Sequence, residues 1–401
     1  MKQEKQNANL AFQTWVAWTI KQGPSLQTQL LEQFQQCAVP KCFNQNFEPF
    51  KDVFEAVLPK GLLTAVAHEA ESRFHNFLKG INLYQASPYR RLASDPPVIW
   101  QRGATRVLDY GDASNPSAPI VLCIPSLVNR SYILDLAEDN SMLRYLASKN
   151  LRPILVDWGE MSEQERGFSL EDYIEKDLKP ILEFLSPQPI YVVGYCMGGL
   201  LATALAQLTP KIKSLVLLAT PWDFHVDQDW LLPYLEGCSE FLEQIINSSN
   251  ELSVEMIQFM LNALNPLSVI KKFRSLGENE QNAETLNKFS AVEDWLNDCV
   301  PLAPQVAKEC LFGWYRDNTP HLGNWRILGQ TITPENLNIP TLVIIPQRDV
   351  IVPPSSAQAL ANKIASCQVL KPQLGHIGAI VGRSACKEVW EPMIHFLKTN
   401  S

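Results

Sequence analysis

The sequence predicts an α/β fold built on a mostly parallel central sheet. Five short, nearly continuous apolar runs, rich in β-branched residues, have the composition of strands that are covered on both faces. They are Ala118–Pro125, Arg152–Trp158, Pro189–Gly194, Lys213–Thr220 and Thr341–Pro346. Helical patterns lie between them at Leu136–Lys149, Ser169–Leu185 and Met197–Leu208. Strands that alternate with helices in this way are typical of a doubly wound sheet.

Two further segments flank and interrupt this predicted core, which comprises residues 101–221 and 331–401. Residues 1–100 are predicted to form a helical N-terminal segment, because apolar residues recur at spacings of three and four from residue 10 to residue 80. A proline-rich extended linker, Tyr84–Trp100, ends this segment. Residues 222–330 contain no good strand but several helical patterns and many aromatic residues. We therefore expect residues 222–330 to form a helical cap insertion over the site.

Composition and charge exclude several functional classes. The chain has 401 residues, of which 46% are hydrophobic, so it can bury a large core without a disulfide or a metal. A net charge of −8 argues against non-specific nucleic-acid binding, which requires a basic face. The nine cysteines show no zinc-type pairing, which favours buried thiols in a reducing compartment. No apolar run is long enough for a transmembrane segment, and the N-terminus does not resemble a signal peptide, so we expect a cytoplasmic protein.

The motif that carries the chemistry is Gly194-Tyr195-Cys196-Met197-Gly198-Gly199. It follows a predicted strand and begins a predicted helix, which is the context of the nucleophile elbow of the α/β-hydrolase fold. Cysteine occupies the position that serine has in most such enzymes. The glycines avoid clashes on the strained turn, and the helix N-terminus favours the thiolate form of Cys196. A buried structural cysteine in a glycine-rich turn is the alternative interpretation.

The general base is expected downstream of the nucleophile, in the order nucleophile, acid, histidine. His376, in the loop Leu374–Gly378 after a strand-like segment, is the candidate that fits this order. His225 and His321 fall inside the predicted cap. His395 falls on an amphipathic C-terminal helix, where a surface or packing role is expected.

Asp349 is the candidate acid, because it directly follows the predicted strand Thr341–Ile345 and precedes His376. A loop carboxylate paired with Arg348 is the structural alternative. Asp157, at the end of an earlier strand, is a rival acid for which a strand-end role is more expected.

Two backbone amides are predicted to form the oxyanion hole. One is the amide of Met197, directly after the nucleophile. The other comes from the loop Pro125–Arg130, where we favour Val128; Asn129 and Arg130 are expected to fix this loop by hydrogen bonds.

From about residue 75 to residue 398, the chain resembles the polyhydroxyalkanoate synthases. This family includes the poly-3-hydroxybutyrate synthases. The elbow GYCMGG is similar to their lipase-like box, which also carries cysteine. Asn129–Leu136 (NRSYILDL) is similar to a specific segment of the family. Further similar segments are Phe77–Ile81, Pro88–Tyr89, Arg106–Tyr110, Trp295–Asp298, Trp314–Asn318, Asp349–Pro353 and Gly375–Ile377. The sequence departs from the family at Val350, where many members carry histidine.

The resemblance implies that Cys196, Asp349 and His376 are catalytic. It implies a (3R)-hydroxyacyl-coenzyme A substrate, an acyl-enzyme on Cys196, release of coenzyme A, and growth of a polyester. It implies no cofactor and no metal, since coenzyme A is part of the substrate. The implied partners are the polyester granule surface and a second copy or a second synthase subunit, and the expected location is cytoplasmic with granule association.

Three other functions remain open from the sequence. The first is a hydrolase, either a thioesterase or a polyester depolymerase, that uses the same Cys-His-Asp triad. The second is a non-catalytic granule-surface or scaffold protein, against which an intact triad argues. The third is a generic lipase or esterase, for which serine would be expected. A cap that covers Cys196 and excludes water would favour the synthase, and a Cys196 open to water would favour the hydrolase.

Overall fold

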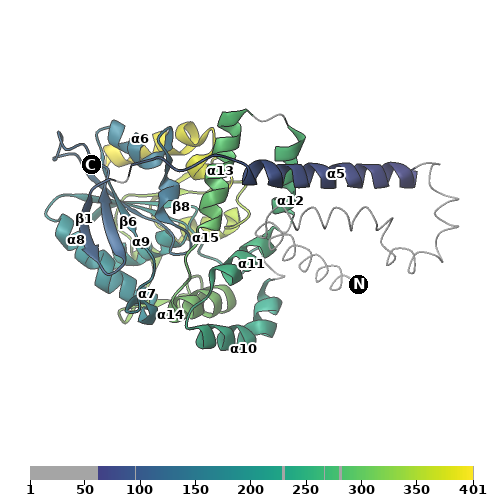
Figure 1. The fold of residues 1–401 in the computed structure, drawn as a ribbon. Helices are drawn as coiled ribbons and strands as arrows, with labels where there is room; N and C mark the ends of the chain where they lie inside the picture. Colours follow the sequence, from purple (N-terminus) through teal and green to yellow (C-terminus); the bar gives the residue numbers. More distant parts are fainter. Residues whose placement is uncertain (1–61, 95, 228–230, 266, 280–281, 401) are drawn as a thin grey trace. The chain divides into compact units, whose positions relative to one another are not determined.

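The computed structural model describes residues 62–94, 96–227, 231–265, 267–279 and 282–400 (Figure 1). The chain divides into two compact units. The larger, which we call the sheet unit, comprises Arg90–Gln258 and Ala291–Ser401. The smaller, the helical unit, comprises Met1–Tyr89 and Phe259–Ser290. The predicted N-terminal helices before residue 62 lie outside the described residues.

An eight-stranded sheet in the order β1-β2-β6-β3-β7-β8-β11-β12 forms the core of the sheet unit. The pair β1–β2 and the pair β2–β6 are antiparallel, and all other neighbouring strands are parallel, which confirms the predicted mostly parallel sheet. The strands are β1 (Val98–Arg102), β2 (Thr105–Asp109), β3 (Ile120–Ile124), β6 (Arg152–Asp157), β7 (Ile190–Tyr195), β8 (Ile212–Leu218), β11 (Thr341–Ile344) and β12 (Cys367–Leu370).

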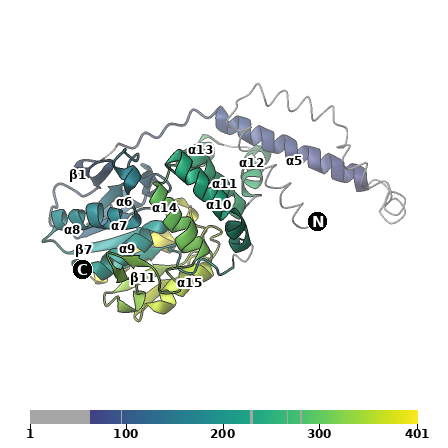
Figure 2. The ribbon, with the colours of Figure 1, turned by 90° about the horizontal axis from the view of Figure 1, so that it is seen from below.

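Helices cover both faces of this sheet (Figures 1 and 2). One face carries α6 and the C-terminal helices, and the other carries α7, α8 and α9 (Figure 1). The helices that follow core strands are α6 (Met142–Ser148), α7 (Leu170–Asp172), η4 (Tyr173–Leu178), α8 (Lys179–Leu185), α9 (Met197–Leu208), α15 (Pro354–Lys363), α16 (Gly378–Val381), η7 (Cys386–Trp390) and α17 (Glu391–Thr399).

The five predicted strands are all present, and three elements differ from the prediction. Strand β1 was not predicted, because its residues are partly exposed and so lack a continuous apolar run. Strand β12 corresponds to the predicted strand-like segment Gln368–Lys371 before the His376 loop. The predicted linker Tyr84–Trp100 is shorter, since a helix continues to Gln85 and β1 begins at Val98. Only the second half of Leu136–Lys149 is helical, because its first residues pair as the short strands β4 (Asp135–Ala137) and β5 (Asn140–Ser141).

The segment predicted as the cap is helical in its described part, with one short two-stranded pair at its end formed by β9 (Arg326–Ile327) and β10 (Gln330–Thr331). Its residues are divided between the two units, since residues 259–290 belong to the helical unit. The helices are α10 (Leu231–Ser249), α11 (Val254–Leu264), α12 (Ser268–Glu278), α13 (Ala283–Asn297), α14 (Pro304–Lys308) and η5 (Glu309–Arg316).

In the helical unit, α5 (Leu62–Gln85) packs directly against α12. Phe77, Leu78, Ile81 and Phe273 form its buried core. Two glycines face the opposite helix: a Cβ on Gly80 would overlap the carbonyl of Phe273, and a Cβ on Gly277 the carbonyl of Asn76. The backbones of α5 and α12 are therefore closer here than they could be if either glycine carried a side chain.

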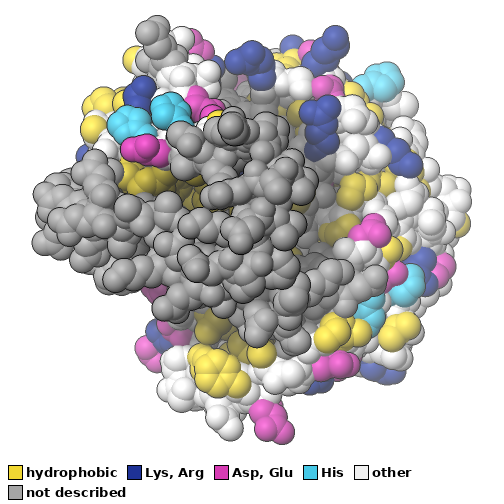
Figure 3. All heavy atoms as spheres, turned by 90° about the vertical axis from the view of Figure 1, so that its right-hand side faces the viewer, with side chains coloured by type: hydrophobic (Ala, Val, Ile, Leu, Met, Phe, Trp, Pro, Cys, Tyr) yellow, Lys and Arg dark blue, Asp and Glu magenta, His cyan; other side chains and the backbone are white. Residues whose placement is uncertain are grey.

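No helix in the described part of the chain is both long and apolar enough to cross a membrane. Where described residues form the face shown in Figure 3, acidic and basic side chains are interspersed with apolar ones.

Gly277→Ala should destabilise the helical unit by roughly 1–3 kcal/mol, the usual cost of forcing extra volume into a packed interface. Amide hydrogen exchange of α5 and α12 measures this loss. The matched control is Gly237→Ala on α10, where an added Cβ meets nothing within 4 Å. Alanine should there stabilise the helix by up to about 1 kcal/mol. Equal protection of α5 in wild type and Gly277→Ala would contradict the close packing.

Candidate active site

Cys196 lies on the sharp turn between β7 and α9. Its backbone has φ 55° and ψ −124°, a conformation that a residue with a side chain rarely adopts. The amide of Cys196 donates a hydrogen bond of 2.9 Å to the carbonyl of Leu218 on β8. The thiol is half-buried. The turn thus presents the sulfur at the carboxyl end of the sheet, where open α/β folds bind ligands.

The three glycines of the motif allow this turn to pack. A Cβ on Gly198 would overlap the carbonyl oxygens of Ile124 and Pro125, and a Cβ on Gly199 would overlap the side chain of Thr220. A Cβ on Gly194 would lie 2.5 Å from the Cα of Gly199. The close contact between β7, α9 and the neighbouring strands therefore requires glycine at these three positions of the motif.

Asp349 and His376 come from the loops that follow β11 and β12, and the structure brings them together. His376 Nδ1 and Asp349 Oδ2 are 2.7 Å apart, and both side chains are buried. The other carboxylate oxygen of Asp349 accepts hydrogen bonds of 2.9 Å from the amides of Ile351 and Val352. These amides fix the carboxylate, which in turn fixes the orientation of the imidazole.

The charges around His376 make it a strong base. Burial lowers the pKa of His376, but the charges of Asp349 and Cys196, together with hydrogen bonds to both, outweigh burial and raise this pKa to about 10. His376 therefore carries a proton at neutral pH.

Two tyrosines border this centre, and sequence reasoning assigned neither a role. The ring of Tyr195 lies tilted against that of His376, with ring centroids 5.1 Å apart, and the Tyr195 hydroxyl donates to the carbonyl of His376 at 3.4 Å. Tyr315, from η5 in the predicted cap segment, is half-buried. Burial and the charges of Cys196 and Asp349 raise the pKa of both hydroxyls, so both stay protonated. Tyr195 follows Gly194 in the motif, and Tyr315 lies in a segment already noted as aromatic, but only the fold places them here.

The predicted oxyanion amides differ in their surroundings. Met197 is the first residue of α9, so its amide has no partner within the helix. The amide of Val128 donates to Ser126 Oγ at 3.2 Å. An oxyanion that bound to the Val128 amide would have to share this N–H with Ser126 Oγ.

The other candidate residues have different partners. Asp157 accepts hydrogen bonds from Arg106 Nε at 3.1 Å and from Ser131 Oγ at 2.8 Å, which gives it a structural role at the end of β6. His225 contacts the carbonyl of Arg316, and His321 lies 3.5 Å from Asp223. His395 is exposed on α17. Among the described residues, no group of three or more His, Cys, Asp or Glu side chains is placed to hold a metal ion.

Comparison with known proteins identifies a matching family model and several named relatives. A family model described as the alpha/beta hydrolase fold matches residues 119–382. The "Poly(3-hydroxyalkanoate) polymerase subunit PhaC" of Haloferax mediterranei is 25% identical over 302 residues, covering 73% of this chain and 61% of the relative. The proteins of the same name from Allochromatium vinosum (24%, covering 76% and 86%) and Synechocystis (27%, covering 71% and 78%) also match.

This chain spans about three fifths of the first relatives' length. These relatives confirm the resemblance read from the motifs. A solved structure, the enol-lactonase of Burkholderia xenovorans, matches with a TM-score of 0.41 and 16% identity, covering 75% of this chain and 100% of that chain.

Iodoacetamide at neutral pH should modify Cys196 faster than the other described cysteines. Burial raises the pKa of Cys123 to about 12, and burial with the charge of Glu309 raises that of Cys310, so both remain neutral thiols. Peptide mapping at successive times measures each site. Faster modification of Cys123 or Cys310 than of Cys196 would contradict the assignment.

Cys196→Ala should lower the pKa of His376 below about 10, because the charge and the hydrogen bond of the sulfur are lost. Titration of ¹⁵N-histidine by NMR measures the shift, with a His376→Asn variant to assign the signal. Since the folded value lies above the ordinary 6.5, the protonated histidine stabilises the fold fully below about pH 6.5 and loses this effect as the pH rises through about 10. An unchanged pKa in Cys196→Ala would show that the sulfur and the imidazole do not interact.

Proposed function

This chain belongs to the α/β hydrolase family, and on that premise we propose that it is an acyltransferase with Cys196 as nucleophile, His376 as base and Asp349 as acid. One observation carries the proposal. A cysteine, and not a serine, occupies the strained turn before α9, and its charge acts on an imidazole that a buried carboxylate holds at 2.7 Å.

The proposed acyl donor is a (3R)-hydroxyacyl-coenzyme A, and the proposed product is a polyhydroxyalkanoate. The names of the relatives and the shared motifs support this choice of substrate. A thiol nucleophile also suits a thioester donor, because exchange of one thioester for another is nearly isoenergetic. The acyl group therefore keeps its reactivity on the enzyme, whereas a serine would store it as a less reactive oxoester.

Acylation begins with the thiolate of Cys196 and the protonated His376. The sulfur attacks the thioester carbonyl, and the amides of Met197 and Val128 stabilise the oxyanion of the tetrahedral intermediate. Collapse of the intermediate breaks the bond to the sulfur of coenzyme A. His376 gives its proton to this leaving group, so coenzyme A departs as a thiol and His376 becomes neutral.

In the transfer step His376 accepts a proton instead of donating one. Once Cys196 is acylated, its negative charge is gone, and one cause of the high pKa of His376 is removed. Neutral His376 takes the proton of a 3-hydroxyl group as this oxygen attacks the acyl-enzyme. The new ester bond forms, the thiolate of Cys196 leaves, and the thiolate–imidazolium pair is restored. Asp349 keeps the imidazole oriented through both steps.

Water competes with the hydroxyl in the second step, and it would convert the enzyme into a thioesterase. Buried aromatic residues of the sheet unit around Tyr315 are suited to exclude it: Phe224 contacts both Trp314 and Tyr315, with ring centroids 5.8 and 4.9 Å apart. We propose that this segment must shift to admit substrate. The proposed reaction needs no cofactor or metal, since coenzyme A enters as part of the substrate.

The proposed partners follow from the product. A growing polyester is insoluble in water, so we propose that the protein works at a granule surface in the cytoplasm. We further propose that a second copy, or a second synthase subunit, assembles with it.

Cys196→Ala should abolish release of coenzyme A from (3R)-hydroxybutyryl-coenzyme A, with a loss on the order of 10⁴-fold or more, as for other removed nucleophiles. Cys196→Ser should be nearly as inactive, because an alcohol is much harder to deprotonate than a thiol. Chromatography separates polymer from free acid and tests the transfer step. Free 3-hydroxybutyrate as the sole product in wild type would support the hydrolase instead.

A further inference from the structure

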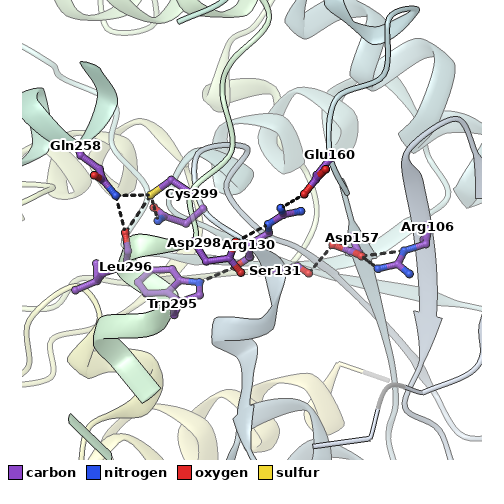
Figure 4. Close-up of polar contacts among 11 residues, drawn as sticks. Arg106, Arg130, Ser131, Asp157, Glu160, Gln258, Trp295, Leu296, Asp298 and Cys299 are labelled. Carbon is purple, nitrogen blue, oxygen red and sulfur yellow. Dashed lines mark hydrogen bonds and ion pairs between the residues drawn. The ribbon is translucent and has the colours of Figure 1, made fainter. Parts of the chain in front are cut away.

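The loop after β3 is held in place by residues far away in the sequence. This oxyanion loop, Pro125–Ser131, contains Val128 and therefore contributes to the proposed chemistry. Figure 4 shows that it lies against the segment Trp295–Val300, at the end of α13. Both segments belong to the sheet unit.

Three hydrogen bonds join this segment to the backbone of the loop or to the side chain of Asn129. The buried indole of Trp295 donates a hydrogen bond of 2.8 Å from Nε1 to the carbonyl of Arg130. The amide of Val300 donates to the carbonyl of Val128 at 3.3 Å. Asn129 Nδ2 donates to Cys299 Sγ at 3.0 Å, and the two residues also form an antiparallel backbone bridge.

The opposite side of the loop is anchored to the core. Ser131 Oγ donates to Asp157 on β6. The guanidinium of Arg130 pairs with Glu160 after β6 at 2.7 Å and also reaches Asp298, in the segment Trp295–Val300, at 3.3 Å (Figure 4). The contacts to Val128 and Arg130 fix two carbonyls, one at Val128 and one two residues later. The Val300 amide thus restrains the peptide plane that follows Val128, and the Trp295 indole restrains the plane that follows Arg130, so the backbone on the C-terminal side of the Val128 amide is held at two points.

We propose that Trp295 is a positioning residue for the oxyanion hole, which acts through the carbonyl of Arg130 and touches no substrate. The inference rests on the proposed function. An oxyanion donor is effective only when its N–H points at the oxygen of the tetrahedral intermediate, and small displacements are costly. The loop is irregular backbone, so this precision must come from contacts such as the one that Trp295 makes.

Two reactions of the same sulfur separate this role from a merely structural one. Alkylation of Cys196 by iodoacetamide attacks a saturated carbon and forms no oxyanion. Acylation by p-nitrophenyl acetate or (3R)-hydroxybutyryl-coenzyme A passes through a tetrahedral oxyanion. A displaced oxyanion loop therefore slows acylation and leaves alkylation unchanged.

Trp295→Phe keeps an aromatic ring and removes only the indole N–H. We expect its single-turnover acylation rate to fall about five- to tenfold, the equivalent of one lost hydrogen bond, with an unchanged alkylation rate. The matched control is Trp390→Phe, which removes a buried indole N–H that has no hydrogen-bond partner and should leave both rates unchanged. Cys299→Ala should reproduce part of the effect, and Cys299→Ser, which keeps an acceptor for Asn129, should restore it.

The outcomes distinguish this inference from the proposed function. Equal acylation rates in wild type and Trp295→Phe, or a parallel loss of acylation and alkylation, would overturn the positioning role alone. Acylation of wild type by p-nitrophenyl acetate but not by the coenzyme A thioester would overturn the proposed substrate, while the variant series still tests Trp295. Wild type that is alkylated at Cys196 but acylated by neither donor would overturn both.

Discussion

The backbone of Cys196 is the constraint on which the rest of the site depends. To reverse the chain from β7 into α9, this residue adopts φ 55° and ψ −124°, and the strain is held by tight packing on every side. Gly194, Gly198 and Gly199 have no room for a side chain because β3, β8 and α9 approach so closely. The same turn directs the sulfur toward His376 and the N-terminus of α9 toward the sulfur. The turn thus places the sulfur where it adds to the effect of Asp349 in raising the pKa of His376.

The central strands could be predicted because burial on both faces leaves a direct trace in the sequence. Strands such as β3 and β7 are buried at every residue and therefore read as unbroken apolar runs. The edge strand β1 leaves no such trace, since part of it is exposed. The division of residues 222–330 between two units was not predictable either. It depends on the close approach of α5 and α12 at Gly80 and Gly277, two glycines almost two hundred residues apart that carry no local pattern.

The candidate site residues could be selected from the sequence where local chemistry dictates the residue type. The motif around Cys196 and the order of Asp349 and His376 along the chain follow from the geometry of the turn and the topology of the sheet, and the structure brings the last two within hydrogen-bond distance. Tyr195, Tyr315 and Trp295 could not be assigned in this way, because an aromatic residue is equally suited to ordinary core packing. Asp157 shows the reverse case. It had the position of an acid, but its carboxylate accepts hydrogen bonds from Arg106 on β2 and from Ser131, and the second bond anchors the loop Pro125–Ser131.

The most direct test of the account is to identify the covalent intermediate. Wild-type protein is mixed rapidly with (3R)-hydroxybutyryl-coenzyme A, quenched in acid and analysed by intact mass and peptide mapping. The account predicts one acyl group on Cys196, formed before steady-state turnover, stable to acid and released by neutral hydroxylamine as a thioester is. Release of coenzyme A with no adduct, or with the acyl group on another residue, would contradict it.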